Sequence, residues 1–539
     1  MSVRTGGRLV AESLAALGAQ AVFGVPGIHA LPIWEGLRES ELRLIGARTE
    51  LGAGFAADGY ARTSGRPAVL LLSTGPGALN ALTALMEAAS AHVPIVAVAS
   101  QIPSALLGTG RGYLHKLDGQ RDAVAAVVKH AARARTAAEI PQRLAEAFAI
   151  AAAPPSGPVF VEIPVDLLSA DPGRAEPPRP PTPGGAPPAG SEAVAEAARL
   201  LAGARRPVLW AGGGVLRSGA QAELRALAER LDAPVVTTFM GKGALGDEHP
   251  LAVGSGCDEA AVQSLIADAD VVLAVGTELG ADTTAQYALA LTGELIHLDA
   301  APQRIGASYP ALGLVGDARA TLAAVRQALP DAPSAAAEPG APRAAAVRER
   351  IRTGLIAQGR GDELRLLATV QDALPAGGMS TWDMTILAYW AAAHLRLRSG
   401  QRFHYPLGSG TLGYAWPAAL GAAVAEPGRR VLAVCGDGGL AYGLAELATA
   451  RQHDLDATLL VVDDGGYGIL REYQREDYGH TVAVDLVQPD LARVADAFGV
   501  PVRAGGLDSA AENLRWGLSA DGPAVVVVRA RLAAPAPTP

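Results

Sequence analysis

Short apolar runs that end in glycine-rich turns constrain the fold of this chain most strongly. Examples are PAVLLLSTGPG at 67–77, RPVLWAGGG at 206–214, RRVLAVCGDGG at 429–439 and TLLVVDDGGYG at 458–468. Strands that are apolar without alternation are buried on both faces, which is typical of parallel sheets covered by helices. The sequence therefore predicts an α/β fold with parallel sheets, in which ligands bind at the carboxyl ends of the strands.

Two stretches rich in Pro, Ala and Gly divide the 539 residues into three parts of ordinary domain size. Residues 171–190 and 330–346 lack apolar bulk, so we interpret them as extended linkers. We expect the C-terminal tail, which ends in APAPTP, to be frayed. The predicted domains are residues 1–170, 191–329 and 347–532, and the tail is residues 533–539.

The composition excludes several classes of protein. The net charge is −9 and no compact Lys/Arg cluster is present, which argues against a nucleic-acid partner. Only Cys257 and Cys435 occur, which argues against a disulfide framework and fits a reducing compartment. No signal peptide and no uncharged apolar stretch of about 18 residues is found. We therefore expect a soluble, cytoplasmic protein without a membrane partner.

Two adjacent carboxylates, Asp463 and Asp464, follow a strongly apolar run. Asp437 lies 27 positions before Asp464, in a turn between Gly436 and Gly438. One helix and one strand fit between them, so the two aspartates can end neighbouring parallel strands. Oxygen ligands beside a glycine turn and a helix N-terminus predict a magnesium–diphosphate site. The alternative is an ordinary tight turn.

The two aspartates are expected to differ in role. Successive side chains of a strand point to opposite sides, so only Asp464 can face the metal. Asp463 then either accepts hydrogen bonds from loop amides or forms an Asx-type turn.

The motif GDG, followed about 27 residues later by an Asn/Asp pair and GxYG, resembles the cofactor motif of thiamine-diphosphate enzymes. This resemblance extends over nearly the whole chain. It implies three parallel-sheet domains: pyrimidine-binding, Rossmann-like middle and diphosphate-binding. It also implies thiamine diphosphate and Mg²⁺ as cofactors, with Asp437, Asp464 and the Gly466 carbonyl as metal ligands. Asp463 stands where the family usually has Asn.

The stretch RTELGAGFAADGYAR, residues 48–62, resembles the family segment that carries the activating acid. The resemblance makes Glu50 the carboxyl group that hydrogen-bonds the aminopyrimidine ring of the cofactor, although Thr49 replaces the usual histidine. Alternatively, Glu50 is an acid in the first turn of a helix.

Other first-domain motifs match the family as well. GVPGIHALPIW and STGPGALNALTAL resemble its early turns, and LHKLDGQ resembles a segment near the substrate. We expect the two histidines of these motifs to be catalytic or, alternatively, surface loop residues. The candidates are Pro26, His29, Thr74, Asn80 and His115.

PLGSGTLGYAWPAALGAAV, residues 406–424, resembles the family element that bends the cofactor. Leu412 would support the bent shape and the Gly410 carbonyl would hold the exocyclic amine; alternatively, Leu412 packs in an ordinary core loop. Thr385 in TWDMTIL would meet the diphosphate. Further cofactor-binding candidates are Gly436, Gly438, Gly439, Tyr467, Gly468 and Ile469.

Several phrases resemble the acetolactate-synthase-like subgroup that includes 5-guanidino-2-oxopentanoate decarboxylase. The implied reaction is non-oxidative decarboxylation of a 2-oxo acid through ylide and enamine intermediates. Leu470 stands where pyruvate decarboxylases carry a catalytic Glu. Alternatives are a carboligase, of the acetolactate synthase or aldehyde ligation type, and a non-catalytic relative, against which Glu50 argues.

The resemblance also implies partners. The active site would form between the first domain of one subunit and the third domain of another, in a homodimer or homotetramer. Glu472, Glu476 and Asp477 would meet a guanidinium group or, alternatively, form a solvated helix face. FAD is doubtful, because the middle domain lacks the usual flavin segment and GGGVLRSG, 212–219, is a weak dinucleotide signal.

Overall fold

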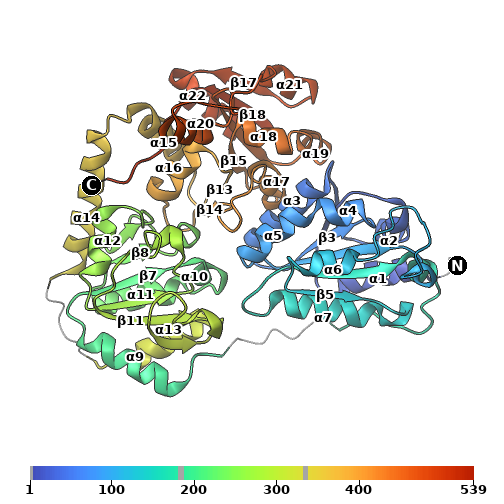
Figure 1. Cartoon of the computed structure of the whole chain (residues 1–539), viewed down its shortest axis with the longest axis horizontal. Coiled ribbons are helices and arrows are strands. Elements are labelled where there is room, and N and C mark those ends of the chain that lie inside the picture. Colours follow the sequence, from blue (N-terminus) through green and yellow to red (C-terminus); the bar gives the residue numbers. More distant parts are fainter. Residues whose placement is uncertain (1–3, 180–186, 332–337, 539) are drawn as a thin grey trace.

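The computed structural model describes residues 4–179, 187–331 and 338–538. Within these ranges the chain forms three six-stranded sheets, and all neighbouring strands in them are parallel. Figure 1 shows the first domain in blue, the middle domain in green and the third domain in orange to red. The predicted α/β fold with three parallel-sheet domains is confirmed.

The first sheet has the strand order β2-β1-β3-β4-β6-β5. Alternate residues of β3 belong to different cores: Leu70 and Leu72 to one, Val69 and Leu71 to the other. Burial on both faces explains the apolar runs without alternation. The strands are β1 (Ala21–Gly24), β2 (Arg43–Gly46), β3 (Ala68–Leu72), β4 (Ile95–Gln101), β5 (His130–Arg133) and β6 (Val159–Pro164). The helices are α1 (Gly6–Ala16), α2 (Leu31–Arg38), α3 (Glu50–Ser64), α4 (Pro76–Asn80), α5 (Leu82–Ser90), α6 (Gln120–Ala125), α7 (Ile140–Ala152) and α8 (Val165–Ser169).

The middle sheet has the order β12-β11-β10-β7-β8-β9, so the strand order reverses between β7 and β10. Open sheets of this kind bind ligands at that reversal. The strands are β7 (Pro207–Ala211), β8 (Val235–Thr237), β9 (Ala252–Gly254), β10 (Val271–Val275), β11 (Glu294–Asp299) and β12 (Leu312–Val315). The helices are α9 (Ser191–Gly203), α10 (Gly213–Arg217), α11 (Gln221–Leu231), α12 (Ala260–Ala267) and α13 (Ala318–Ala328).

The third sheet, β14-β13-β15-β16-β18-β17, repeats the topology of the first. The strands are β13 (Met379–Trp382), β14 (Arg402–His404), β15 (Val431–Gly436), β16 (Ala457–Asp463), β17 (Val502–Gly505) and β18 (Ala524–Arg529). The helices are α15 (Gly361–Ala373), α16 (Ile386–His394), α17 (Ala415–Ala425), α18 (Asp437–Gly443), α19 (Glu446–Gln452), α20 (Gly468–Tyr478), α21 (Leu491–Ala497) and α22 (Ala510–Leu518).

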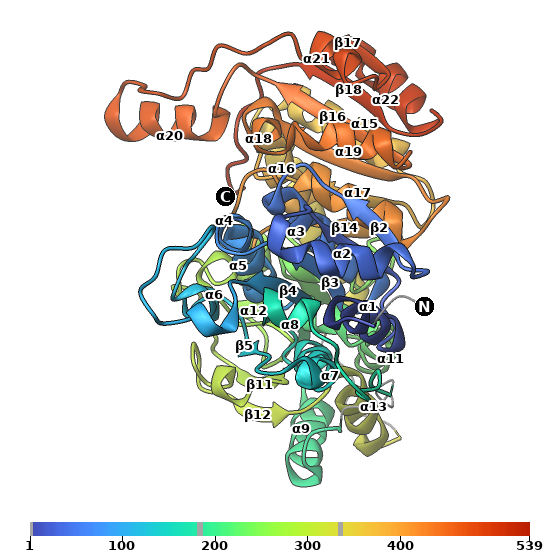
Figure 2. The same cartoon turned by 90° about the vertical axis from the view of Figure 1, so that its right-hand side faces the viewer.

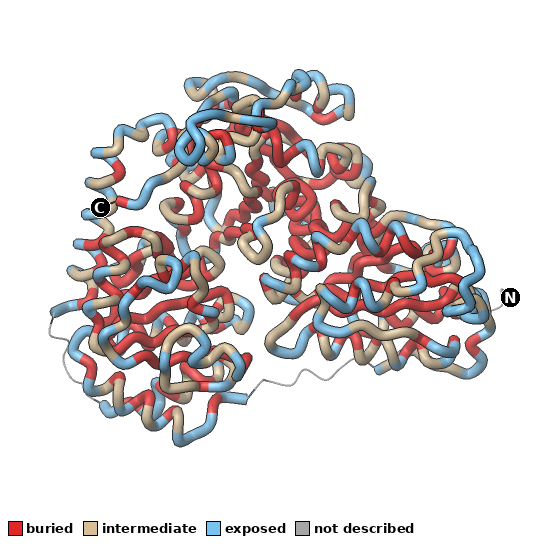
Figure 3. The backbone as a smooth tube through the Cα atoms, in the orientation of Figure 1, coloured by how far each residue is buried: buried red, intermediate tan, exposed pale blue. Residues whose placement is uncertain are grey.

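Helices α3 and α17 join the first and third domains, and their small residues let the two backbones touch. A Cβ atom on Gly59 would lie 2.0 Å from the Ala418 carbonyl oxygen, and one on Gly421 would lie 1.7 Å from that of Ala56. One buried core therefore runs through both domains. Figure 3 shows buried backbone segments, in red, in both domains. The third domain is thereby fixed against the first domain of the same chain.

Two boundaries differ from those expected from composition. Helix α14 (Gly340–Ala357) begins inside the stretch 330–346, because APRAAAVRER supplies strong helix formers directly after a proline. The tail 533–538 has no regular structure, yet it is packed: the Ala533 amide donates to Glu363 at 2.8 Å, and Thr538 is buried against Glu259. In the described ranges, none of the helices has the length and apolar character needed to cross a membrane.

Candidate active site

A cavity of about 260 Å³ opens at the carboxyl ends of β13, β15 and β16. It is lined by every third-domain residue that the sequence analysis selected as a cofactor or metal ligand. These are Thr385, Gly410, Leu412, Gly436, Asp437, Gly438, Gly439, Asp464, Gly466, Tyr467, Gly468 and Ile469. Further, largely apolar side chains complete the wall, among them Leu470, which stands at the pyruvate decarboxylase Glu position; the others are Met384, Ile386, Leu387, Tyr389, Val462 and Leu532.

Asp437 and Asp464 lie at the ends of the neighbouring strands β15 and β16. The Asp464 amide approaches Oδ1 of Asp437 at 3.4 Å. Oδ2 of Asp437 and Oδ1 of Asp464 are buried and have no hydrogen-bond partner among the residues that the structure describes. Burial raises the pKa of Asp437, and burial together with the Asp437 charge raises that of Asp464 to about 6. Two unpartnered carboxylate oxygens in one wall are the environment that a cation would stabilise.

This donor set fits Mg²⁺ bound together with a diphosphate. In the described part of the chain, no group of three or more His, Cys, Asp or Glu side chains gathers around a common metal position. Mg²⁺ is usually held by one or two carboxylates together with phosphate oxygens and water. The Gly466 carbonyl oxygen lies close to the Asp437 turn, 3.3 Å from the position that a Cβ on Gly438 would take.

The Asp463 side chain is separate from this arrangement. Asp463 pairs across the sheet with Arg529, whereas Asp464 approaches Arg471 at 3.6 Å. Among the described residues, the Asp463 carboxylate accepts no hydrogen bond, so neither the bonds from loop amides nor the Asx turn is formed. Its role remains electrostatic, because its charge contributes to the raised pKa of Asp437.

Glycines form the floor of the cavity because no side chain would fit there. A Cβ on Gly468 would lie 2.1 Å from Oδ2 of Asp464, and one on Gly436 would lie 3.0 Å from Oγ1 of Thr385. Without Cβ atoms, backbone amides can approach a phosphate closely. The start of α18 points its amides at the same region, which favours an anion there.

Replacing Gly438 with alanine is expected to weaken thiamine diphosphate binding about tenfold or more. The new Cβ would lie 2.8 Å from Cδ1 of Tyr467, so the loop that carries the metal-site residues has to move. Calorimetric titration of the cofactor checks this. Gly203→Ala is the matched control, because no atom lies within 4 Å of its Cβ position. Equal affinities of the two variants would contradict the assigned role of Gly438.

Asp383 is a site residue that the motifs did not identify. It is buried, and its carboxylate accepts from the Gly413 amide at 3.0 Å and from the Met384 amide at 2.9 Å. Burial raises its pKa to about 6. Asp383 thus fixes the end of the loop that presents Gly410 and Leu412 to the cavity. The only sequence signal was an acid inside the otherwise apolar or hydroxyl-bearing TWDMTIL.

The first-domain candidates lie elsewhere, at the carboxyl edge of the first sheet. Glu50 begins α3 and is half-buried; Thr49 caps the helix by accepting from the Gly52 amide at 2.9 Å. The exposed Asn80 donates to Glu50 at 3.2 Å. Thr74 is fully buried and bonds Ser100 at 2.9 Å, so its hydroxyl faces the domain interior.

His29 and His115 lie together, with ring centroids 5.6 Å apart. Nδ1 of each is buried, and it has no hydrogen-bond partner in the described part of the chain. Burial and the neighbouring His115 lower the pKa of His29. A neutral imidazole with a free ring nitrogen can accept or relay a proton. Within the chain, none of the first-domain candidates, including the exposed Pro26, lines the third-domain cavity.

The acidic residues after the metal loop do not line the cavity either. Glu472 accepts from the Ala534 amide at 2.9 Å, so it holds the C-terminal tail. Glu476 and Asp477 are exposed on α20. Figure 2 shows α20 standing away from the rest of the molecule.

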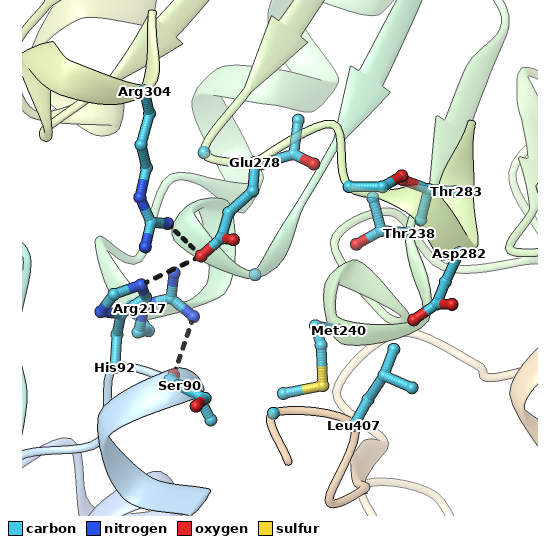
Figure 4. Close-up of a pocket in the computed structure, with 16 residues that line it drawn as sticks. Ser90, His92, Arg217, Thr238, Met240, Glu278, Asp282, Thr283, Arg304 and Leu407 are labelled. Carbon is cyan, nitrogen blue, oxygen red and sulfur yellow. Dashed lines mark hydrogen bonds and ion pairs between the residues drawn. The ribbon is translucent and has the colours of Figure 1, made fainter. Parts of the chain in front are cut away.

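A second cavity, of about 440 Å³, lies where all three domains meet. It faces the ends of β7 and β10, the strand-order reversal of the middle sheet. Figure 4 shows Glu278 between Arg304 and His92, at 2.5 Å and 3.6 Å. Arg217 also lines this cavity.

The charged residues that line this second cavity do not indicate a flavin-binding site. The cations that a dinucleotide phosphate needs are present, but Glu278 already pairs with Arg304. Asp282 adds a further carboxylate to the wall. We therefore assign no part of the reaction to FAD.

With this fold and this cavity, the chain falls in the class of three-domain α/β proteins that bind a phosphorylated cofactor at the edge of a parallel sheet. Family profiles described as domains of thiamine pyrophosphate enzymes match it in order. The N-terminal TPP binding domain matches residues 4–125, the central domain 194–325 and the C-terminal TPP binding domain 383–528.

Similar proteins agree with these matches. A probable 2-ketoarginine decarboxylase of Pseudomonas aeruginosa is 39% identical over 97% of this chain and 94% of its own length. An acetolactate synthase of Mycobacterium bovis is 34% identical over 92% of this chain and 82% of its own length. A probable acetolactate synthase large subunit of Methanocaldococcus jannaschii is 30% identical over 92% of this chain and 86% of its own length. The chain belongs to the thiamine pyrophosphate (thiamine diphosphate) enzyme family, as a thiamine-diphosphate-dependent decarboxylase or carboligase.

Proposed function

We propose that this enzyme decarboxylates a 2-oxo acid without oxidation. The observation that carries the proposal is the similarity, over nearly the full length of both chains, to a probable 2-ketoarginine decarboxylase. A 2-oxo acid with a guanidinium side chain is accordingly the first substrate to test. Bound thiamine diphosphate supplies an electron sink for the electron pair that remains when carbon dioxide leaves.

The residues of the third domain hold and shape the cofactor in this proposal. Asp437, Asp464 and the Gly466 carbonyl would hold Mg²⁺, whose charge would offset that of the diphosphate. Leu412 and the Gly410 carbonyl would contact the organic part of the cofactor. The apolar wall excludes water, which strengthens the electrostatic interactions inside the cavity.

The first domain supplies the proton-transfer groups. Glu50 hydrogen-bonds the aminopyrimidine ring, with Asn80 orienting its carboxylate at 3.2 Å. His29 and His115 exchange protons with the substrate, because each keeps a buried ring nitrogen without a partner. These groups act only if they reach a third-domain cavity.

We propose that a second copy of the chain brings Glu50 to the cavity. The cavity of one chain lacks any first-domain residue, and Glu50 is half-exposed rather than enclosed. Large apolar side chains are exposed on both surfaces that would meet. On the first domain these are Ile28, Leu31, Tyr113 and Leu114; on the third domain they are Tyr442, Leu470, Tyr473 and Tyr478.

Co-expressing Glu50→Gln and Asp464→Ala chains is expected to restore activity that each variant lacks alone. A mixed dimer has one cavity with an intact metal site and an intact Glu50 from the other chain. One of the two sites of such a heterodimer is intact, so the purified heterodimer is expected to show about half of wild-type turnover, because each active site needs groups from two copies. Turnover of the purified, separately tagged heterodimer measures it.

Absence of any restored activity in a verified heterodimer would contradict a shared site. The control is a dimer of two Glu50→Gln chains that carry different tags. It has no intact site, whether the site is shared between two chains or lies within one chain.

A product analysis separates decarboxylase from carboligase. Carbon dioxide and organic products are quantified from a panel of 2-oxo acids, with and without an aldehyde acceptor. An aldehyde product in stoichiometric amount supports the decarboxylase. The acetolactate synthase relatives favour the alternative, for which acceptor-dependent formation of a new carbon–carbon bond is the expected result.

A further inference from the structure

A buried carboxylate outside the cavity holds the loop that shapes it. Glu87 lies on α5 in the apolar segment LTALMEAAS, and its side chain is fully buried. The proposed reaction uses no group on this helix. Burying a carboxylate is unfavourable unless hydrogen bonds and a cation compensate for the lost water, so the partners of Glu87 show what it does.

The partners of Glu87 come from two domains. Oε2 of Glu87 accepts from the Ser409 amide at 2.7 Å and from its hydroxyl at 2.9 Å. Oε1 accepts from the Arg62 guanidinium at 3.1 Å. Gly408 rests directly on α5, since a Cβ there would lie 2.9 Å from the Glu87 carbonyl oxygen. The third-domain loop is therefore attached to the first domain at Gly408 and Ser409.

The groups facing Glu87 form a closed ionic network. Arg62 also pairs with Asp58 at 2.6 Å, and the buried Tyr414 hydroxyl donates to Asp58 at 2.7 Å. One arginine thus serves two buried carboxylates. Burial raises the pKa of Glu87, and the charge of Arg62 opposes that rise. Because Glu87 shares the charge of Arg62 with Asp58, the two hydrogen bonds from Ser409 are important for stabilising its buried carboxylate.

Two carboxylates hold the loop 405–414, one near its middle and one near its end. Glu87 holds Ser409, and Asp383 holds the Gly413 amide at 3.0 Å. Gly410 and Leu412, which line the cavity, lie between these two anchors. Gly410 adopts a left-handed conformation (φ 68°), so the chain turns sharply directly after Ser409.

We propose that Glu87 is a positioning residue for the cofactor cavity of its own chain: it sets the position of Gly410 and Leu412 by binding Ser409. The inference rests on the proposed function in so far as Gly410 and Leu412 contact the cofactor. One first domain then serves two cavities, with Glu87 acting on its own chain and Glu50 on the partner.

The test is hydrogen–deuterium exchange of the cofactor-free, full-length protein, followed by cofactor titration. Glu87→Gln keeps the size of the side chain but removes its charge. Amide exchange in the peptide covering 405–414 is expected to become about tenfold faster, because hydrogen bonds to a charged group are the stronger ones. Thiamine diphosphate affinity is expected to fall about tenfold, with exchange elsewhere unchanged.

Two further variants keep the test decisive. Ser409→Ala removes only the hydroxyl contact and is expected to give a smaller change in the same peptide, and adding it to Glu87→Gln should give no further change. Exposed Glu192 provides the control, Glu192→Gln, which should match wild type. If Glu87→Gln does not fold, the exchange rate of the 405–414 peptide in Ser409→Ala alone tests the inference.

The inference would be overturned if the folded variants exchanged the amides of 405–414 at the wild-type rate, even with a lowered melting temperature. Glu87 would then be a merely structural residue. Failure of the proposed function would look different: wild-type protein would bind no thiamine diphosphate or release no carbon dioxide, while the exchange result would stand.

Discussion

Glu50→Gln is expected to lower kcat by about 10²–10⁴-fold, the usual contribution of a positioned acid or base. Glutamine has nearly the same shape but lacks the ionisable proton that the aminopyrimidine ring needs. Thiamine diphosphate affinity is expected to change little, because the residues proposed to hold the diphosphate, Asp437 and Asp464, lie in another domain. Steady-state kinetics and calorimetric titration of the same preparation measure both quantities.

Glu41→Gln is the control, an exposed acid of the same domain. Unchanged turnover of Glu50→Gln would remove Glu50 from the reaction. A parallel loss of cofactor binding and turnover would make it a binding residue instead.

Asp464→Ala is expected to weaken Mg²⁺-dependent cofactor binding about 100-fold or more, since even indirect metal-site contacts are worth 10–100-fold. The cofactor-free protein is expected to keep its melting temperature. Removing Asp464 ends its repulsion with Asp437, which offsets the loss of the 3.6 Å approach to Arg471. Cofactor titration with and without Mg²⁺, and thermal unfolding of the cofactor-free protein, measure these effects.

The neighbouring residue gives a matched control. Asp463→Ala also removes one carboxylate, but the Asp463 side chain makes no hydrogen bond among the described residues and does not line the cavity. It is expected to change cofactor affinity only a few-fold. Equal losses in the two variants would show that total charge, and not coordination by Asp464, binds the cofactor.

The sequence predicted the features that depend on local pattern. Strands buried on both faces must be apolar throughout, so β3 and β15 were visible as uninterrupted runs. The Asp437–Asp464 spacing was informative because one βαβ unit fixes which strand ends become neighbours. The third-domain candidates for cofactor and metal binding consequently line one cavity.

The features that depend on distant contacts were not visible. Glu87 binds Ser409 across 322 positions of sequence, and no local pattern marks an acid whose partner lies in another domain. The tail was expected to be frayed because its Pro/Ala composition carries little apolar bulk, whereas it is held by Glu363, Glu472 and Glu259. Thr74 matched a motif, but its hydroxyl bonds inward to Ser100.

Cofactor-dependent release of carbon dioxide tests the central claim most directly. The protein is stripped with a chelator and supplied with 1-¹³C-labelled 2-oxo acids, including the guanidinium-bearing one, and labelled carbon dioxide is followed. We predict release only when thiamine diphosphate and Mg²⁺ are both restored, and almost none from Glu50→Gln. Release that needs neither cofactor, or none from any 2-oxo acid by the fully loaded enzyme, would contradict the account.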